Sequence, residues 1–187
     1  MRDDITNAIK VLREGGIILY PTDTIWGIGC DATNEAAVER VFNIKRRADS
    51  KAMLLLTDSP AKLNYYIEEI PEMAWDLIEL AEKPLTIIYP GARNLAKSLL
   101  AEDGSVGIRV TREAFSRQLC ERYRKPIVST SANLSGQPAP AFFSEITDDI
   151  KEAVDYIVEY RRDDNTPAQP SGILKLGTRG EIKVIRE

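Results

Sequence analysis

The spacing of apolar residues predicts the elements of the N-terminal third. A four-residue apolar face at helical spacing, ended by the glycines at 15 and 16, predicts a first helix; its members are Ile5, Ala8, Ile9 and Leu12. The apolar run 17–20, closed by Pro21, predicts a buried strand. Residues 21–33 have no consistent period and are expected to form mainly an ordered loop. Asn34 then caps a second helix that ends near Lys45.

Strand and helix patterns continue to alternate after this point. Strands are expected at 53–56, 85–89, 106–110 and 127–130, and helices at about 60–69, 71–82, 94–101, 112–123 and 143–153. Three consecutive strands follow at 156–160, 171–176 and 181–185, separated by the loop-like stretch 161–170. Successive strands without intervening helices pair most easily as antiparallel neighbours. The pattern therefore predicts a layered α/β fold, with helices flanking a mixed sheet in a single domain over residues 1–187.

Composition narrows the classes of function. The 187 residues, 43% hydrophobic and 29% charged, suit one globular domain. A net charge of −4 argues against a general electrostatic nucleic-acid binder. There is no histidine, which excludes Ser-His or Cys-His catalysis and His-ligated zinc. Cys30 and Cys120 are expected as core residues of a protein in the reducing cytosol, and neither a signal peptide nor a membrane span is expected.

Glycines of the early loop match a dinucleotide fingerprint only superficially. Gly27, Gly29 and Ala32 have the GxGxxA spacing, but residues 21–26 separate them from the preceding strand. The glycines are better explained by a tight turn and close backbone approach.

Three polar features are candidates for chemistry. The segment 40–51 carries five cations and one acid, which suits either a solvated helix end or a polyphosphate site. The polar segment 129–138 follows an apolar strand, as in ligand-binding loops or simple turns and caps. Arg109 stands among apolar residues of a predicted strand. Strand alternation could point its side chain to solvent, or its guanidinium could bind a carboxylate through two hydrogen bonds. No activating partner marks a serine nucleophile.

Taken together, these segments resemble the YrdC/TsaC family of threonylcarbamoyl-AMP synthases. The resemblance runs in order over nearly the whole chain, and its distinctive part is a KxR pair with an SxN pair. The matching segments are Tyr20–Thr24, Trp26–Gly29, Lys45 with Arg47, Leu85–Ile87, Val106–Val110 and Ser131–Gly136. It implies an open, twisted mixed sheet of the YrdC or DHBP-synthase type and a positively charged cavity.

The resemblance also implies a reaction and its partners. L-Threonine, bicarbonate and ATP, with Mg²⁺, would give L-threonylcarbamoyl-adenylate and pyrophosphate without an organic cofactor. A tRNA threonylcarbamoyltransferase complex would then modify the adenosine beside the tRNA anticodon, and tRNA is a further expected partner. The expected location is the cytoplasm.

Site residues follow from the match to the family pattern. The expected catalytic set is Lys45, Arg47, Ser131 and Asn133, with the last two facing the cations across the cavity. The expected ATP-binding set is Lys45, Arg47, Lys51, Ser105, Ser131 and Arg186. The expected threonine-binding set is Arg109, Ser171 and either Thr22 or Thr24, and no residue is assigned to a metal.

The chain departs from the family pattern at three positions, and two other functions compete. Ala48 stands where proline is usual, Leu56 where some relatives place histidine, and Gly172 where threonine follows the serine. The chain is also expected to lack the C-terminal domain of longer members.

An RNA-binding module of the same fold is the main alternative function, but it would favour a broader basic face and stacking aromatics. A carbamoyl-transfer domain like that of hydrogenase maturation proteins is expected to come with further modules.

The absence of histidine generates a prediction. Turnover of the reaction implied by the resemblance should show no inflection from an enzyme imidazole near neutral pH. The measurement is the pH dependence of pyrophosphate release. An inflection near pH 6.5 that ligand titration does not explain would instead indicate a perturbed group of another type.

Overall fold

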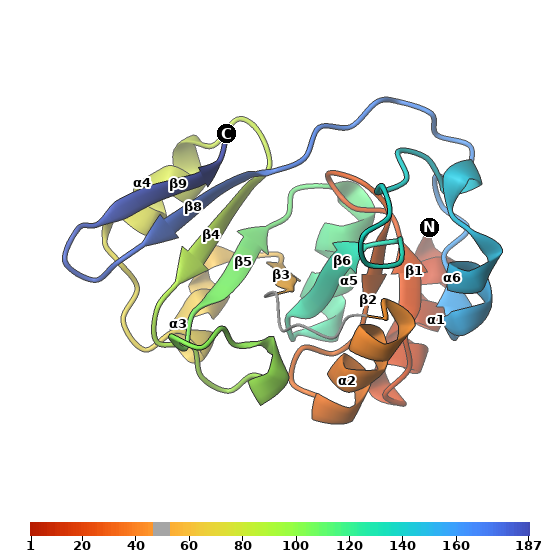
Figure 1. Cartoon of the computed structure of the whole chain (residues 1–187), viewed down its shortest axis with the longest axis horizontal. Coiled ribbons are helices and arrows are strands. Elements are labelled where there is room, and N and C mark those ends of the chain that lie inside the picture. Colours follow the sequence, from red (N-terminus) through yellow and green to blue (C-terminus); the bar gives the residue numbers. More distant parts are fainter. Residues whose placement is uncertain (47–52) are drawn as a thin grey trace.

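The computed structural model describes residues 1–46 and 53–187, and its centre is one mixed nine-stranded sheet (Figure 1). The strand order is β7-β1-β2-β6-β3-β5-β4-β8-β9. Three neighbouring pairs are parallel, namely β7 with β1, β3 with β5 and β4 with β8, and the other five are antiparallel. The strands are β1 (Ile18–Tyr20), β2 (Gly27–Gly29), β3 (Leu54–Thr57), β4 (Leu85–Tyr89), β5 (Val106–Val110), β6 (Ile127–Ser131), β7 (Tyr156–Ile157), β8 (Gly172–Leu176) and β9 (Ile182–Arg186). The expected mixed α/β fold is confirmed.

Helices flank the sheet and are mostly shorter than the pattern predicts. The α-helices are α1 (Arg2–Arg13), α2 (Glu35–Ile44), α3 (Leu63–Tyr66), α4 (Met73–Leu80), α5 (Ala114–Tyr123) and α6 (Asp148–Ala153). Three 3₁₀ turns add to them: η1 (Pro60–Lys62), η2 (Lys97–Leu99) and η3 (Phe143–Glu145). In the described parts of the chain, no helix is long and apolar enough to cross a membrane.

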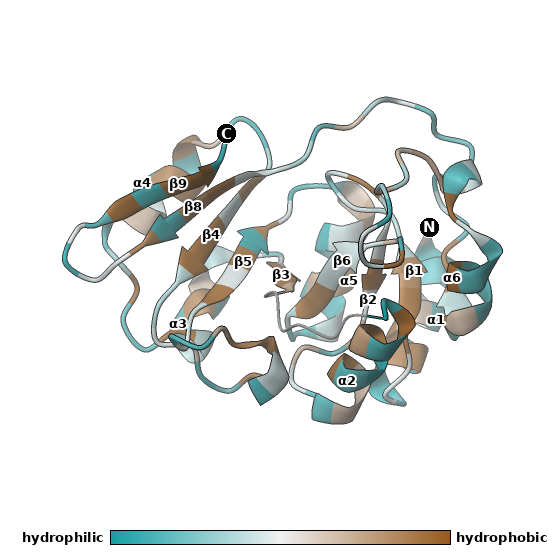
Figure 2. Ribbon diagram, viewed as in Figure 1, coloured by the Kyte–Doolittle hydropathy of each residue, from teal (hydrophilic) through white to brown (hydrophobic). Residues whose placement is uncertain are grey.

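The core lies between the sheet and the helices α1 and α5, which pack against each other on one face (Figures 1 and 2). The apolar face predicted for α1 is buried in full. Leu119 and Phe115 of α5 are likewise buried completely. Cys30 and Cys120 are buried as expected, and burial raises the pKa of both thiols above their usual range. Their thiols are therefore protonated core groups.

Strand β2 is the element that the hydropathy pattern missed. Residues Gly27–Gly29 carry only one side chain of any size, so their pairing cannot be read from side-chain alternation. The pairing becomes clear in three dimensions, where Tyr20 crosses Gly29 and its hydroxyl donates to the carbonyl oxygen of Val128 at 3.0 Å. Close backbone approach is thus confirmed for these glycines, while the expected tight turn is wrong because they lie in a strand.

The C-terminal strands are not all antiparallel neighbours. Strand β7 pairs in parallel with β1 at one edge of the sheet, whereas β8 pairs in parallel with β4 near the other. Only β8 and β9 form the expected antiparallel pair. Residues 158–171 consequently cross the molecule between the two sheet edges, as the long blue connection in Figure 1 shows. Side-chain pattern alone carries no information about this crossing.

The helix expected at 94–101 is also wrong. Asn94 has a left-handed backbone, and the amide of Ala96 donates to the carbonyl oxygen of Ala32 at 2.9 Å. The Glu35 carboxylate accepts from the amides of Lys97 and Ser98. These tertiary bonds replace helical ones and leave only the turn η2.

The contact between Gly29 and Tyr20 yields a prediction about stability. A Cβ at position 29 would lie 2.5 Å from Tyr20 Cε1 and 2.6 Å from the Val128 carbonyl oxygen. Gly29→Ala should therefore lower the free energy of unfolding by about 1–3 kcal/mol, the usual cost of overpacking. Urea denaturation measures it, with Gly172→Ala as the control because its nearest neighbour lies 3.6 Å away. Equal stability of the two variants would contradict this explanation.

Candidate active site

A cavity of about 620 Å³ lies over strands β2, β6, β3 and β5. The crossing segment covers part of it through Ala168, Pro170 and Ser171. Its other described lining residues are Thr24, Ile25, Trp26, Gly27, Met53, Leu54, Arg109, Ser129, Thr130, Ser131, Ala139, Ala141 and Arg186. Hydroxyls and two guanidiniums share this wall with apolar side chains. The cavity therefore offers several hydrogen-bond donors to a polar or anionic ligand.

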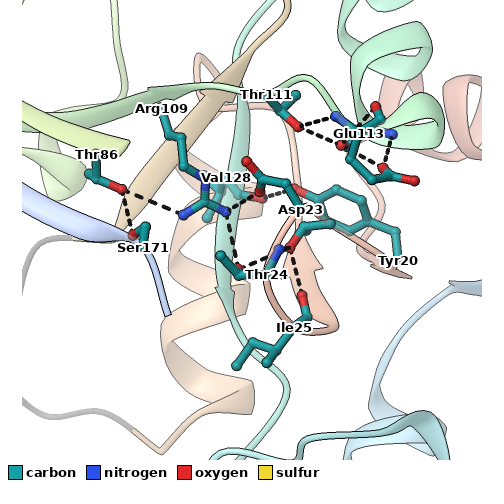
Figure 3. A network of polar contacts seen from close by, with 12 residues as sticks. Tyr20, Asp23, Thr24, Ile25, Thr86, Arg109, Thr111, Glu113, Val128 and Ser171 are labelled. Carbon is teal, nitrogen blue, oxygen red and sulfur yellow. Dashed lines mark hydrogen bonds and ion pairs between the residues drawn. The ribbon is translucent and has the colours of Figure 1, made fainter. Parts of the chain in front are cut away.

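Arg109 is the buried cation of the cavity wall (Figure 3). Its side chain is only 2% exposed, so the outward orientation considered from strand alternation is wrong. Nη2 lies 2.8 Å from Asp23 Oδ1 and donates to Thr24 Oγ1 at 3.3 Å. Nη1 donates to Thr86 Oγ1 at 3.5 Å, while Nε–H has no acceptor among the described residues. Arg109 thus retains unused donor capacity, which suits a carboxylate.

Ser171 connects this cation to the C-terminal strand. Its Oγ lies 3.0 Å from Thr86 Oγ1, and both side chains are buried. Arg186 of β9 donates from Nε to the Ser171 carbonyl oxygen at 2.8 Å and from Nη2 to Ser171 Oγ at 3.3 Å. Two arginines from strands β5 and β9 therefore reach one hydroxyl cluster.

Lys45, Ser131 and Asn133 form a second polar cluster. The Lys45 ammonium donates to the carbonyl oxygens of Ser131 at 2.6 Å and Asn133 at 2.8 Å. It also lies 3.4 Å from Ser131 Oγ and 3.2 Å from Asn133 Oδ1. The three residues, expected to face one another across the cavity, are instead in direct contact. Of the three, Ser131 lines the cavity. Lys45 holds in place the segment that presents the Ser131 hydroxyl to the cavity.

The structure also distinguishes the two candidate threonines. Thr24 lines the cavity, whereas Thr22 faces its own loop. Thr22 Oγ1 donates to the Ile25 carbonyl oxygen at 2.7 Å and accepts from the Thr24 amide at 3.1 Å. Thr22 therefore shapes the loop on which Thr24 is carried.

Other predicted site residues lie apart from this cavity or outside the described residues. Ser105 is buried at the start of β5, where its hydroxyl donates to Asp103 at 2.6 Å, and it is not among the described lining residues. Arg47 and Lys51, together with Ala48, lie outside the described residues. Leu56, at the position where some relatives place histidine, is fully buried beside Arg109 in the sheet.

Sequence reasoning did not assign roles to Asp23 or Thr86, although both lie within segments that it singled out. Thr86 is the register partner of Arg109 between β4 and β5, a relation that depends on strand pairing. Burial raises the pKa of the Asp23 carboxyl, although the Arg109 guanidinium opposes this shift. The available signal for Asp23 was that it is the one charged residue in the segment 21–26.

The described residues contain no group of three or more carboxylate or cysteine side chains placed to hold a metal. Arg161, near the start of the crossing segment, lies outside the cavity lining and contacts the loop 21–26. It donates to the Thr22 carbonyl oxygen at 3.2 Å and lies 3.4 Å from Glu113 Oε1. This contact ties the crossing segment to the loop 21–26.

Comparison with known proteins identifies relatives along almost the whole chain. A family model named Sua5/YciO/YrdC and described as telomere recombination matches residues 10–187. The threonylcarbamoyl-AMP synthase of Pseudoalteromonas translucida is 37% identical over 90% of this chain and 91% of its own length. That of Vibrio cholerae is 32% identical over 84% of this chain and 85% of its own length.

Solved structures show the same fold. P. abyssi Sua5 complexed with L-threonine has a TM-score of 0.81 and 27% identity, covering 92% of this chain. The match spans half the length of P. abyssi Sua5. E. coli YciO has a TM-score of 0.85 and 26% identity, covering all of this chain and 90% of that protein. The resemblance predicted from sequence motifs is confirmed, and the chain belongs to the Sua5/YciO/YrdC family.

Proposed function

We propose that this protein is a threonylcarbamoyl-AMP synthase, which makes L-threonylcarbamoyl-adenylate and pyrophosphate from L-threonine, bicarbonate and ATP. The names of its curated relatives and the threonine complex of P. abyssi Sua5 support the proposal. The observation in this molecule that carries it is the buried guanidinium of Arg109 in the cavity wall, with the hydroxyls of Thr24 and Ser171 nearby. A cation among hydroxyls suits an amino acid that has a carboxylate and a hydroxyl.

The proposed threonine site is the Arg109 end of the cavity. Arg109 would donate to the carboxylate through the terminal N–H groups that Asp23, Thr24 and Thr86 leave unused. Thr24 and Ser171 would bind other polar groups of the amino acid. Thr22 would act only through the loop that it stabilises.

The proposed nucleotide site includes the cluster at Ser131 and the guanidinium of Arg186. Lys45 places positive charge directly beside Ser131 and Asn133, where phosphate oxygens would approach. Arg47 and Lys51 stay predicted phosphate ligands from the family pattern. Ser105 stays a predicted ATP ligand, although its hydroxyl is bound to Asp103.

The chemistry needs placed charge more than a proton-transfer residue. The threonine amine first forms an N–C bond with the CO₂ unit of bicarbonate, which gives a carbamate, and the proton lost from nitrogen leaves with the bicarbonate hydroxide as water. A carbamate oxygen then bonds to the α-phosphorus of ATP while the bond to the pyrophosphate oxygen breaks. Negative charge grows on the phosphate oxygens, so cations held in position stabilise the transition state. No step requires the imidazole that this chain lacks.

Mg²⁺ would arrive bound to ATP as part of the substrate. The described residues gather no cage of three acidic side chains, and Mg²⁺ bound to nucleotides usually keeps phosphate and water ligands. Bound there, it supplies neutralising charge to the phosphates. The product adenylate would pass to a tRNA threonylcarbamoyltransferase complex, which acts on tRNA.

The central test is whether pyrophosphate release depends on threonine. Purified protein with ATP, Mg²⁺ and bicarbonate should release pyrophosphate only when L-threonine is added, because the carbamate is the attacking group. A coupled pyrophosphate assay measures this directly. Threonine-independent release, or none, would count against the synthase. Tight, salt-sensitive tRNA binding without turnover would favour the RNA-binding module instead.

Lys45 provides a second prediction. Lys45→Met should reduce kcat/KM by a factor that corresponds to about 2–4 kcal/mol, the scale for losing a preorganised charge or donor. It should also speed amide hydrogen exchange in residues 131–137, because two loop carbonyls lose their shared donor.

Lys62→Met is the matched control for that measurement. Its ammonium also donates to a backbone carbonyl, that of Cys120, and pairs with Asp58, but it lies outside the cavity. The control should retain normal kcat/KM. Near-normal activity of Lys45→Met, or an equal loss in both variants, would remove Lys45 from the site.

A further inference from the structure

Asp23 touches the cavity's buried cation from outside the cavity. Its Oδ1 lies 2.8 Å from Arg109 Nη2, and the two side chains are 10% and 2% exposed. Arg109 lines the cavity of about 620 Å³, whereas Asp23 lines a separate pocket of about 650 Å³ beside Pro84 and Leu85. Figure 3 shows the guanidinium between Asp23 and Thr86. A ligand in the cavity would therefore meet Arg109 and not the Asp23 carboxylate.

The other contacts of Arg109 are longer than this ion pair, which is a close approach of opposite charges without hydrogen-bond geometry at Asp23 Oδ1. Its hydrogen bonds to Thr24 and Thr86 measure 3.3 and 3.5 Å, near the long limit for such bonds. In both bonds the acceptor is a neutral hydroxyl oxygen. Within the described residues, Asp23 is the one acid that forms an ion pair with Arg109. It therefore supplies the main restraint on the guanidinium.

The loop that carries Asp23 is itself held in place. Thr22 Oγ1 bonds both the Thr24 amide and the Ile25 carbonyl oxygen, which closes the turn around Asp23. Arg161 donates to the Thr22 carbonyl oxygen at 3.2 Å. The nearby acid Glu113 cannot replace Asp23 without losing its own bonds to the amides of Phe115 and Ser116.

Asp23 has two opposing effects on a carboxylate ligand. Its negative charge reduces the net attraction of Arg109 for an anion, while its contact holds the guanidinium in place. An unpaired buried guanidinium is strongly unfavourable, so removing Asp23 would drive the side chain out of its position. A displacement of about 1 Å at a binding group is enough to lose about 100-fold in rate. The positional effect should therefore exceed the electrostatic one.

We propose that Asp23 is a positioning residue for amino-acid binding, which fixes Arg109 so that its remaining N–H groups receive the threonine carboxylate. The inference rests on the proposed function, because it takes threonine as the ligand. Asp23 is expected to affect the binding of the amino acid and not the binding of ATP.

The test is steady-state kinetics of Asp23→Asn, which keeps the size of the side chain and removes its charge. The KM for L-threonine should rise by about 10- to 100-fold, while the KM for ATP should change less than about twofold. Calorimetric binding of L-threonine gives a second readout without turnover. A fall in the threonine KM would mean that charge cancellation dominates and would overturn the proposal.

Asp31→Asn is the matched control for a buried, ion-paired acid. Asp31 pairs with Lys125 at 3.0 Å and accepts from Tyr123, away from the cavity lining. Its loss should lower the melting temperature without changing the ratio of the two KM values. If Asp23→Asn behaves in the same way, Asp23 is merely structural.

A double-mutant cycle tests whether Asp23 acts through Arg109. Asp23→Asn should cause no further rise in the threonine KM when Arg109 is already alanine. Additive effects would overturn the proposed route.

Asp23→Glu covers the case in which Asp23→Asn does not fold. It keeps the buried charge pair but moves the guanidinium, so the threonine KM should again rise. An unchanged threonine KM would reject the proposal. If the unmodified protein neither binds threonine nor releases pyrophosphate with it, the proposed function fails as well. If the unmodified protein is active and the Asp23 variants keep its KM for threonine, only the inference about Asp23 fails and the proposed function stands.

Discussion

The buried charge of Arg109 is the constraint on which the site depends. A guanidinium removed from water is tolerated only beside an acid or other acceptors, and here these come from separate parts of the chain. Asp23 and Thr24 belong to the loop between β1 and β2, and Thr86 belongs to β4. Pairing the Arg109 charge therefore brings the loop between β1 and β2 into contact with strands β5 and β4 beside the cavity.

The site also requires close packing between strands β1, β2 and β6. Gly29 lets the Tyr20 ring lie against β2, and the Tyr20 hydroxyl then reaches the Val128 carbonyl oxygen. This contact sets β1, β2 and β6 side by side, and so aligns the loop 21–26 with the polar end of β6. The crossing segment adds Ser171, which contacts both Thr86 and Arg186. Packing and polar contacts thus assemble the cavity from distant segments.

The proposed site would support nucleotidyl transfer without histidine. Its cations are arginine and lysine side chains, and their hydrogen bonds orient them before any ligand arrives. Lys45 is bound to two loop carbonyls, so its charge has a fixed place beside Ser131. Nucleotidyl transfer benefits from such preorganisation because charge develops at known oxygens.

The sequence by itself determined the α/β class, the apolar face of α1, most strand positions and the family, because these depend on local periodicity and ordered motifs. It also singled out Arg109, an unusual charge in an apolar strand. It could not reveal β2, whose glycines lack the side chains that carry a period, or the parallel pairing of β7 with β1. Only the tertiary structure decided that Arg109 points inward to Asp23, that Thr24 lines the cavity and that Lys45 touches Ser131. These relations join residues far apart in the chain, and their free energy comes from burial and charge pairing that no local segment contains.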